Sequence, residues 1–485
     1  MRAALSFLGL LCLVAGSLAQ SGPEIASYFK TDLSPASAVY LPSESLFTQE
    51  TTQRWNAFSS PSYAVSVKPA SDEDVQKIIH YAFMHNISFL ATGGGHGYSA
   101  TLGTVQSGIE MDLGHFNNYS INAEANTITV GGSIHFRNIT GPLYAAGKEW
   151  RATLGGGVGP YGGLHGLQID SLQSVRMVTG AGNLITVSAT QHPDLFWVMR
   201  GAGFNFGVVT SATYQVYPYT NNGQAMNADF RFNASANASL YEFARSYTGK
   251  QPDAFSIDIA IAYNENFGGT YLFANFIYAG PLSEGLSLIQ PILALKPFQQ
   301  NITMIPWSLI ETTSKFGTDA AACIKGNYHS VWGLNLYQID VPTLSSAVEY
   351  MDAMFKANKG FRESFLAIDM YATRVTQSVP DEETAYPYRS AVARFLLDVG
   401  FIDPSLSTNA SNVGRGARAL FIPTSGASTK NIEVYVNYGH GDEGPLGWYS
   451  ERKMPRLTEL KKRYDPNGLF SHYNAIRRTY NVPKV

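Results

Sequence analysis

Cysteine and charged residues are scarce in this chain, and each shortage excludes a class of protein. The 485 residues include only two cysteines, Cys12 and Cys323, and Cys12 lies in an N-terminal segment that we expect to be removed. No disulfide can then form within the mature chain, a zinc site built on cysteine is excluded, and we expect no metal. Charged residues make up 15% of the chain and the net charge is −3, which argues against a nucleic-acid partner because such proteins need a basic face.

The chain also lacks the common phosphate-binding motifs. It contains no G-x-x-x-x-G-K-[S/T] sequence, which excludes a P-loop, and no G-x-G-x-x-G sequence at the start of a predicted helix. The second absence disfavours a nicotinamide-dependent dehydrogenase with a Rossmann fingerprint. A nucleotide-binding site in this chain must therefore be built in another way.

Long apolar runs are absent after the N-terminus. Ala3–Gly16 is apolar, Arg2 precedes it, and Ser17–Ala19 follows as a small-x-small sequence. This pattern predicts a secretory signal peptide in residues 1–19, whereas a membrane anchor, the alternative, would need a longer run. We expect a secreted protein with no membrane association after the signal is removed. N-glycosylation is favoured by sequons at Asn86, Asn118, Asn138, Asn233, Asn237, Asn301 and Asn409.

Apolar residues make up 45% of the chain, enough for a large core, and its length predicts two or three domains. Tyr63–Val67 alternates like a strand, and Ser71 is placed as the N-cap of a helix with apolar residues at helical spacing. Ile87–Leu90 is a second short strand that runs directly into Gly93–Ser99. Strand, helix, strand and glycine-rich loop in this order are typical of an α/β nucleotide-binding domain.

Two loops are rich in glycine, Gly93–Ser99 and Gly155–Gly163. A pyrophosphate needs several backbone N–H groups close by, and a Cβ atom would obstruct that approach. The two loops could together hold a dinucleotide, or each could be a simple tight turn. His96 lies within the first loop, where a neutral imidazole could attack the 8α-methyl group of a flavin. A structural or solvent-exposed histidine is the alternative.

The composition changes after Tyr219, where longer alternating strands appear. A helical pattern over Leu344–Ala357 lies among them, so we predict an antiparallel sheet backed by helices. The predicted strands are Ala254–Tyr263, Thr270–Tyr278, Val331–Tyr337, Phe365–Tyr371 and Asn431–Tyr438.

These motifs resemble those of a known superfamily. Three segments look like the FAD domain of the vanillyl-alcohol oxidase/p-cresol methylhydroxylase superfamily: Gly93–Ser99, Gly155–Gly163 and Asp194–Thr210. Three segments of the tail are similar to the C-terminal signature of berberine bridge enzyme-like proteins: Tyr435–Tyr438, Asp465–Asn467 and Asn474–Ile476. The chain looks most like the secreted fungal members, and the resemblance covers nearly everything after Pro61.

The resemblance implies an α+β fold with a two-part FAD-binding domain of the p-cresol methylhydroxylase type. The FAD-binding domain would comprise residues 20–218 and a returning C-terminal segment, 441–485. Residues 219–440 would form the substrate domain, with the antiparallel sheet and its helices.

The resemblance also assigns roles to matching residues. His96 matches the histidine that is joined to the flavin 8α-carbon. Asn205, Phe206 and Val208 lie in the segment whose backbone meets the flavin or adenine, and Asn474 is where a tail residue approaches the flavin. Tyr438 takes the place of the tyrosine base in cannabinoid-cyclising relatives; a tyrosine that packs in the sheet is the alternative. The cradle for the pyrophosphate and ribityl groups would consist of Gly93, Gly94, Gly95, Gly97, Tyr98, Ser99, Gly155, Gly156, Gly157 and Gly159.

One departure from the family pattern lies just before the second glycine loop. Many relatives carry there a cysteine that forms a second flavin bond, and a residue that gates oxygen. In this chain Trp150 runs almost directly into Arg151–Leu154, so that stretch is missing. We therefore expect covalent FAD through His96 only.

The implied reaction is hydride transfer from a substrate C–H bond to flavin N5, while Tyr438 takes the proton of a neighbouring O–H or amine group. We expect a secreted FAD-dependent oxidase that uses molecular oxygen and acts on a small organic substrate in fungal secondary metabolism. A carbohydrate oxidase is the first alternative. A catalytically impaired relative is the second, and the missing stretch is its best support.

Overall fold

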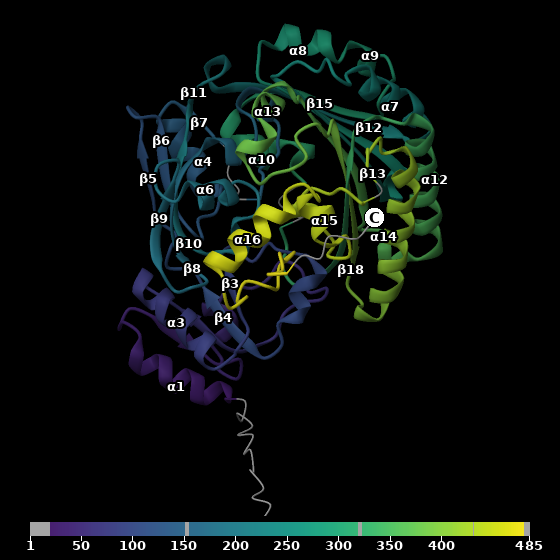
Figure 1. The fold of residues 1–485 in the computed structure, drawn as a ribbon. Helices are drawn as coiled ribbons and strands as arrows, with labels where there is room; N and C mark the ends of the chain where they lie inside the picture. Colours follow the sequence, from purple (N-terminus) through teal and green to yellow (C-terminus); the bar gives the residue numbers. More distant parts are fainter. Residues whose placement is uncertain (1–19, 151–154, 319–322, 430, 480–485) are drawn as a thin grey trace, which may run out of the picture.

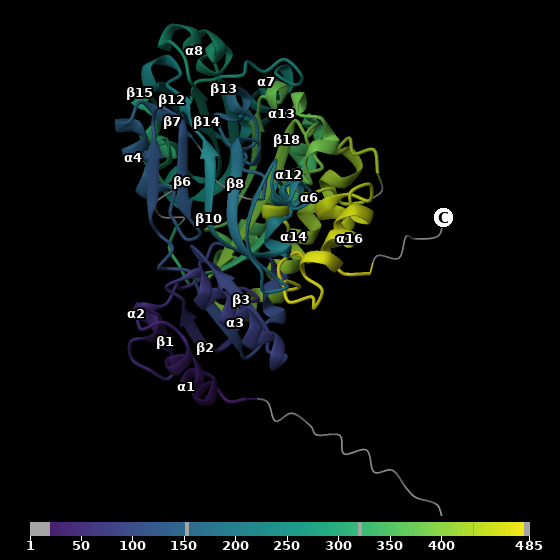
Figure 2. The same ribbon diagram turned by 60° about the vertical axis from the view of Figure 1, so that its left-hand side comes forward.

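The structure is a computed structural model that describes residues 20–150, 155–318, 323–429 and 431–479. The predicted signal peptide and the junction Arg151–Leu154 lie outside the described residues. In the N-terminal part, the described residues form a four-stranded sheet, a five-stranded sheet and a short two-stranded pair. The following part carries one large sheet with long helices on its outer side (Figure 1 and Figure 2).

The first sheet lies next to the N-terminus and leads into the first glycine-rich loop. Its order is β1-β2-β4-β3, and β4 is parallel to both β2 and β3. Its strands are β1 (Ala38–Tyr40), β2 (Tyr63–Lys68), β3 (Phe89–Thr92) and β4 (Gly108–Asp112). Helices α1 (Gly22–Asp32) and α3 (Asp72–Met84) share its apolar core. Ser71 caps α3 as predicted, because its hydroxyl accepts a hydrogen bond from the Asp74 amide at 3.1 Å.

The second sheet has five antiparallel strands in the order β5-β6-β10-β8-β9. Its strands are β5 (Tyr119–Asn122), β6 (Thr127–Gly131), β8 (Leu172–Thr179), β9 (Leu184–Ser188) and β10 (Gly207–Gln215). One apolar core joins this sheet to α4 (Arg137–Ala145), α6 (Pro193–Met199) and the C-terminal helix α16 (Met454–Tyr464). The tail therefore packs on the N-terminal part of the chain; the boundaries 20–218, 219–440 and 441–485 stay a prediction.

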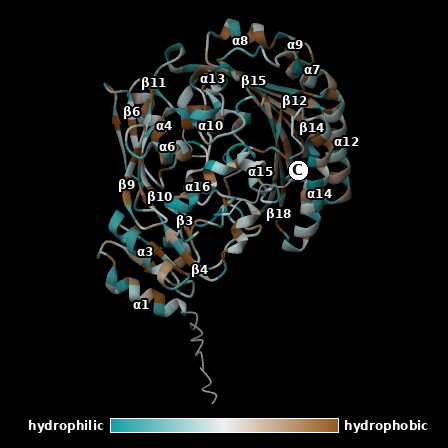
Figure 3. Ribbon diagram, in the orientation of Figure 1, coloured by the Kyte–Doolittle hydropathy of each residue, from teal (hydrophilic) through white to brown (hydrophobic). Residues whose placement is uncertain are grey.

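The third sheet has seven antiparallel strands in the order β15-β12-β14-β13-β17-β18-β16. They are β12 (Gln224–Asn233), β13 (Phe255–Asn264), β14 (Gly269–Tyr278), β15 (Gln299–Pro306), β16 (Tyr328–Leu336), β17 (Phe365–Tyr371) and β18 (Ala393–Phe401). Helices α7 (Asn237–Ser246), α12 (Val341–Ala357) and α14 (Ser407–Phe421) pack on one face. Hydrophilic and hydrophobic residues are interspersed along α12 and α14, as expected for helices with one buried side (Figure 3). The predicted α+β fold with a helix-backed antiparallel sheet is confirmed.

The shorter elements connect these three sheets. They are α2 (Phe47–Glu50), β7 (Lys148–Glu149), α5 (Gly162–His165), β11 (Tyr217–Pro218), α8 (Leu282–Leu288), α9 (Gln290–Leu293), α10 (Ile310–Thr313), α13 (Arg374–Ser378) and α15 (Gly444–Tyr449). Strands β7 and β11 pair with each other, so the residues just before Arg151 are tied to the end of the N-terminal part.

The face of the seven-stranded sheet opposite the helices carries a row of polar side chains, one from each strand. In the strand registers each member lies directly opposite the next, in the order Asn301, Asp229, Asn275, Asp258, Asp369, Arg394 and Asn335. We call these residues the polar row. Their chain neighbours, such as Phe230, Ile257 and Phe395, belong to the apolar core under the helices, because successive side chains of a strand point to opposite faces.

The strand predicted for Asn431–Tyr438 is wrong. Val436–Tyr438 forms a turn of 3-10 helix, and the described residues just before it belong to no strand. Apolar residues alternate in this segment, but Glu433 and Tyr435, which the pattern places on the other face, are buried as well. The segment is enclosed on both sides, and the Val434 amide bonds to the carbonyl of Gly447 instead of a strand partner.

Candidate active site

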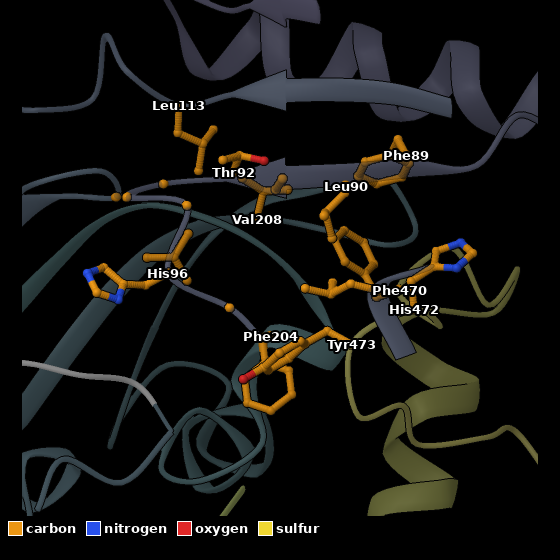
Figure 4. Close-up of a pocket in the computed structure, with 18 of the residues that line it drawn as sticks. Phe89, Leu90, Thr92, His96, Leu113, Phe204, Val208, Phe470, His472 and Tyr473 are labelled. Carbon is orange, nitrogen blue, oxygen red and sulfur yellow. The ribbon is translucent and has the colours of Figure 1, made fainter. Parts of the chain in front are cut away.

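A cavity of about 370 Å³ opens where the first glycine loop, the start of β10 and the tail meet (Figure 4). Its walls include loop residues Gly93–Gly97, the β10 residues Gly207–Val209 and the tail residues Leu469–Tyr473. The structure thus brings Gly93, Gly94, Gly95, His96, Gly97 and Val208 together around one cavity, and their role in binding the cofactor stays a prediction. Arg54, Gly132 and Phe204 also line the cavity, and sequence reasoning missed them.

The backbone of the first glycine loop is packed too closely to carry side chains. A Cβ atom on Gly95, where φ is +73°, would lie 2.6 Å from the carbonyl oxygen of Gln53. Arg54 holds the loop from the cavity wall, since its Nη2 donates to the Gly97 carbonyl oxygen at 2.7 Å. Its buried Nε has no hydrogen-bond partner among the described residues. Bare backbone next to an unsatisfied cationic donor suits the phosphate groups of a dinucleotide such as FAD.

The His96 ring turns away from Phe470 and Tyr473, toward the side of the cavity that the tail does not cover (Figure 4). It stacks at 6.1 Å on Trp55, which in turn stacks at 3.9 Å on His329. The side chain is accessible, but the surrounding protein still lowers its pKa by desolvation, and the charges of Lys325 and Arg54 lower it further. His96 is therefore neutral at pH 7, which is the nucleophilic form of the ring.

The predicted residues Ser99, Asn205 and Asn474 do not line the cavity; they join the segments that do. Ser99 Oγ donates to Asn474 Oδ1 at 2.7 Å, and the Ile476 amide donates to Asn205 Oδ1 at 2.9 Å. Each of the three side chains is at most 1% exposed. These hydrogen bonds hold the tail against the first glycine loop and against the residues that lead into β10. Phe206 is buried in the core behind them.

The second glycine loop lies outside this cavity. The Gly157 amide donates to the hydroxyl of Tyr435 at 2.9 Å. A Cβ atom on Gly155 would lie 2.1 Å from Asn437 Oδ1, and one on Gly156 would lie 2.6 Å from a ring carbon of Tyr435. Gly159 accepts a hydrogen bond from the Gly162 amide within the loop. The loop thus contacts the turn that carries Tyr438, and the role of Gly155, Gly156, Gly157 and Gly159 in holding the cofactor stays a prediction.

Tyr438 is half-buried and pairs with Asp369, a buried residue of the polar row. Its hydroxyl donates to Asp369 Oδ2 at 2.9 Å. Burial raises the pKa of Asp369 to about 6, with a further increase from Asp258, while Lys315, Tyr438 and Arg394 act to lower it. Burial, followed by the Asp369 charge, holds the pKa of Tyr438 well above its ordinary value. Tyr438 is therefore a neutral phenol at pH 7, and it can accept a proton only if its own proton passes to Asp369.

Asp369 was not predicted from the sequence. It is separated from Tyr438 by 69 residues, and only the register of β17 shows which carboxylate meets the tyrosine.

Three further tyrosines connect the cavity to the Tyr438–Asp369 pair. Tyr473 lines the cavity, and the rings of Tyr435 and Tyr438 lie 5.0 Å apart at 64°. Burial raises the pKa of Tyr98 well above its usual value, and Tyr473, Tyr435 and Asp369 add to the increase because they lie close by. Phenol groups therefore lie close together between the cavity residue Tyr473 and Tyr438.

None of the helices that the described residues form is long and apolar enough to cross a membrane. The described residues also contain no group of three or more His, Cys, Asp and Glu side chains arranged to hold a metal ion.

Comparison with known proteins agrees with the cavity and the fold. Residues 63–188 match the family described as FAD binding domain, and residues 434–477 match the family described as berberine and berberine like. The FAD-linked oxidoreductase azaL of Aspergillus niger is 40% identical over 452 residues, which cover 90% of this chain and 95% of that protein. The FAD-linked oxidoreductase tazL of Aspergillus terreus is 36% identical over 493 residues, covering 98% and 99%.

Solved structures share the fold at lower identity. BBE-like 1 of Physcomitrella patens superimposes with a TM-score of 0.80 at 18% identity, covering 95% of this chain and 100% of that one. The xylooligosaccharide oxidase of Myceliophthora thermophila gives 0.78 at 21% identity with the same coverage.

The fold and the cavity define an FAD-linked oxidoreductase. The chain belongs to the berberine bridge enzyme-like family of the vanillyl-alcohol oxidase/p-cresol methylhydroxylase superfamily, which confirms the resemblance seen in its motifs.

Proposed function

We propose that this protein is a secreted FAD-dependent oxidase that oxidises a hydroxyl- or amine-bearing carbon of a small organic molecule in fungal secondary metabolism. The hydrogen bond between Tyr438 and Asp369 carries the proposal, because it provides a buried proton acceptor on the substrate face of the sheet. The fungal FAD-linked oxidoreductases that resemble the chain over nearly its whole length support the reaction class.

In the proposed reaction the chain's own residues handle the proton. The bound FAD supplies a hydride acceptor, and molecular oxygen is the final electron acceptor. The Tyr438 oxygen takes the proton of the substrate hydroxyl or amine as the phenol proton moves to Asp369 Oδ2. The chain thus avoids forming a free tyrosinate, which the raised pKa of Tyr438 opposes.

We further propose that His96 is the single covalent attachment point of the flavin. With FAD bound, the neutral imidazole of His96 would supply the nitrogen for a C–N bond to the flavin 8α-carbon. A methyl C–H bond would be broken in exchange, and dioxygen would be the two-electron oxidant. Desolvation and the charges of Lys325 and Arg54 support this assignment, because they lower the pKa of His96 and keep its imidazole neutral.

Secretion and N-glycosylation belong to the same proposal. Five of the sequon asparagines, Asn86, Asn118, Asn138, Asn233 and Asn409, are exposed, so glycans at these positions would extend into solvent. Asn237 and Asn301 are partly buried.

A carbohydrate oxidase is the second candidate, and the polar row favours it. Side chains such as Asp258 and Asn275 could bind the hydroxyl groups of a sugar. One of the solved structures with this fold is a xylooligosaccharide oxidase in complex with xylobiose.

The test is anaerobic flavin reduction by the purified secreted protein. The visible spectrum first shows whether flavin is bound; a colourless protein would point to a catalytically impaired relative. A panel of hydroxylated aromatic polyketides, alkaloid-type amines, xylobiose and chito-oligosaccharides then separates the two candidates. With a substrate that reduces the flavin, Tyr438→Phe should slow reduction by about 10²–10⁴-fold. Tyr119 is an exposed tyrosine on β5, and the Tyr119→Phe variant is the matched control. Unchanged reduction in Tyr438→Phe would assign the proton acceptor elsewhere.

A further inference from the structure

We propose that the ion pair between Asp258 and Lys315 controls the charge of Asp369, so that both residues are positioning residues for the proton transfer. The inference rests on the proposed function only in one respect: that function is the reason why the charge of Asp369 matters. The electrostatic coupling of the three groups is a property of the protein without substrate and can be tested by itself.

Asp258 and Asp369 face each other across two neighbouring strands. They are register partners on β13 and β17, and they are 9% and 5% exposed. Side chains directly opposite on antiparallel strands have Cβ atoms roughly 4.5–5.5 Å apart, and like charges at that separation repel. The charge of Asp258 in this position raises the pKa of Asp369.

Lys315 gives the two carboxylates different surroundings, because it forms an ion pair with Asp258. Its Nζ lies 2.9 Å from Asp258 Oδ2, so the cation stabilises the negative charge on Asp258. Asp369 instead accepts a hydrogen bond from the hydroxyl of Tyr438. The two carboxylates therefore differ in their partners: Asp258 is paired with a lysine, and Asp369 is paired with the hydroxyl of a tyrosine. The pKa of Asp369 follows the same geometry, since Asp258 raises it and Lys315 lowers it.

The other charged and titratable neighbours of Asp369 do not change this assignment. Arg394 is its register partner on β18, but the guanidinium is shared with Tyr386, to whose hydroxyl Nη2 donates at 3.3 Å. Tyr438 is the hydrogen-bond donor, and Tyr371 is two residues along β17 from Asp369. Lys315 is the cation that forms an ion pair with Asp258, the carboxylate opposite Asp369.

The backbone around Lys315 is held in a conformation that few side chains adopt. Lys315 and Phe316 have φ values of +59° and +55°, in the left-handed region that disfavours residues other than glycine. Their amides donate to the two carboxylate oxygens of Asp229 at 2.8 and 3.2 Å. Asp229 is completely buried and belongs to the polar row, and Asn275 Nδ2 also donates to it at 2.7 Å. A strained turn that is fixed by several bonds is typical of a functional position.

A second cavity adjoins the Asp258–Lys315 pair. It has a volume of about 310 Å³, and its lining includes Asp258, Lys315, Asn275 and the exposed Glu311. Asp369 is the register partner of Asp258, so a proton that Tyr438 delivers to Asp369 lies one strand away from a residue that lines this cavity.

The experiment is an infrared pH titration of the purified holoenzyme without substrate. The C=O stretch of a protonated buried carboxyl is followed, and its loss in Asp369→Asn identifies the band of Asp369. We expect Lys315→Met to raise the titration midpoint by about one pH unit or more, and Asp258→Asn to lower it by a similar amount. Lys315→Arg should keep the wild-type midpoint. Lys356→Met, which removes the exposed partner of Asp352, is the control and should leave it unchanged.

Opposite shifts in the two variants distinguish charge control from a purely structural ion pair. Midpoints that do not move, or that move in the same direction, overturn the proposal. If Lys315→Met does not fold, Lys315→Gln makes the same prediction with a polar side chain of similar length. Because the titration uses neither substrate nor turnover, a failed search for substrates would count against the proposed function and leave this result standing.

Discussion

Glu110 gives the sharpest prediction for stability, because a buried carboxyl group lies directly beneath the first glycine loop. It is on β4, it is 2% exposed, and its Oε1 has no hydrogen-bond partner among the described residues. Ser66 Oγ donates to Oε2 at 2.8 Å. Burial raises the pKa of Glu110 from 4.5 to about 7, and Asp112 adds to the increase.

The sign of the pH effect follows from that increase. Between pH 4.5 and 7 the folded protein keeps a proton on Glu110 that the unfolded chain releases, so stability falls as the pH rises through this range. The loss is complete above pH 7. A difference of this size between the folded and unfolded pKa corresponds to about 3 kcal/mol at 1.36 kcal/mol per pH unit. Replacement by a neutral amide should remove the loss.

The measurement compares apparent melting temperatures of wild type and Glu110→Gln at pH 5 and pH 8. At pH 5 both side chains are neutral, and we expect similar values. At pH 8 the variant should melt higher, by roughly 5 °C or more for a domain of this size. Glu124→Gln replaces an exposed glutamate between β5 and β6 and should change neither value. An equal shift of Glu110→Gln at both pH values would refute the reasoning, since it would show that ionisation of Glu110 is not the cause.

Three further predictions concern the cofactor, secretion and the tail. Flavin should stay with the wild-type protein after acid precipitation and be released from His96→Ala; free release from wild type would contradict the covalent bond. Protein secreted from a fungal host should start after the signal segment and lose mass when treated with an N-glycan-removing enzyme; retention in the cell with the segment uncleaved would contradict this. Lys461→Met should destabilise the protein by about 3–5 kcal/mol in chemical denaturation, because Lys461 and Asp465 form a pair at 2.8 Å with both side chains 0% exposed. Lys462→Met, the neighbouring exposed lysine, should have a much smaller effect.

Local patterns predict much of the fold. The strand predicted for Phe365–Tyr371 coincides with β17, and the helix predicted over Leu344–Ala357 is the main part of α12. In α12 the apolar residues gather on the buried side. In β17 the alternate residues Leu366, Ile368 and Met370 face the apolar core under the helices, and Asp369 lies in the polar row. In the segment before Tyr438 the alternation does not mark a sheet face, because Glu433 and Tyr435 are buried outside any strand.

The candidate site is predictable only where its residues are close in sequence. The loop around His96 could be found because glycine and histidine occur together in it. Asp369, Asp258 and Lys315 could not be found, because their meeting depends on strand registers and on a turn that Asp229 fixes. Arg54 was missed for a similar reason, since it reaches the loop from a preceding segment without regular structure.

The polar row also has a consequence for how the large sheet assembles. A slip of one residue between any two strands turns every side chain of the slipped strand to the other face. For β13 that slip would carry Asp258 into the apolar core beneath α12 and expose Ile257 and Ile259 on the polar side. Burial of an unpaired carboxylate there would cost several kcal/mol. Because each of the seven strands carries one such residue, misaligned pairings are penalised at every strand, and the same residues that shape the site also select the correct sheet during folding.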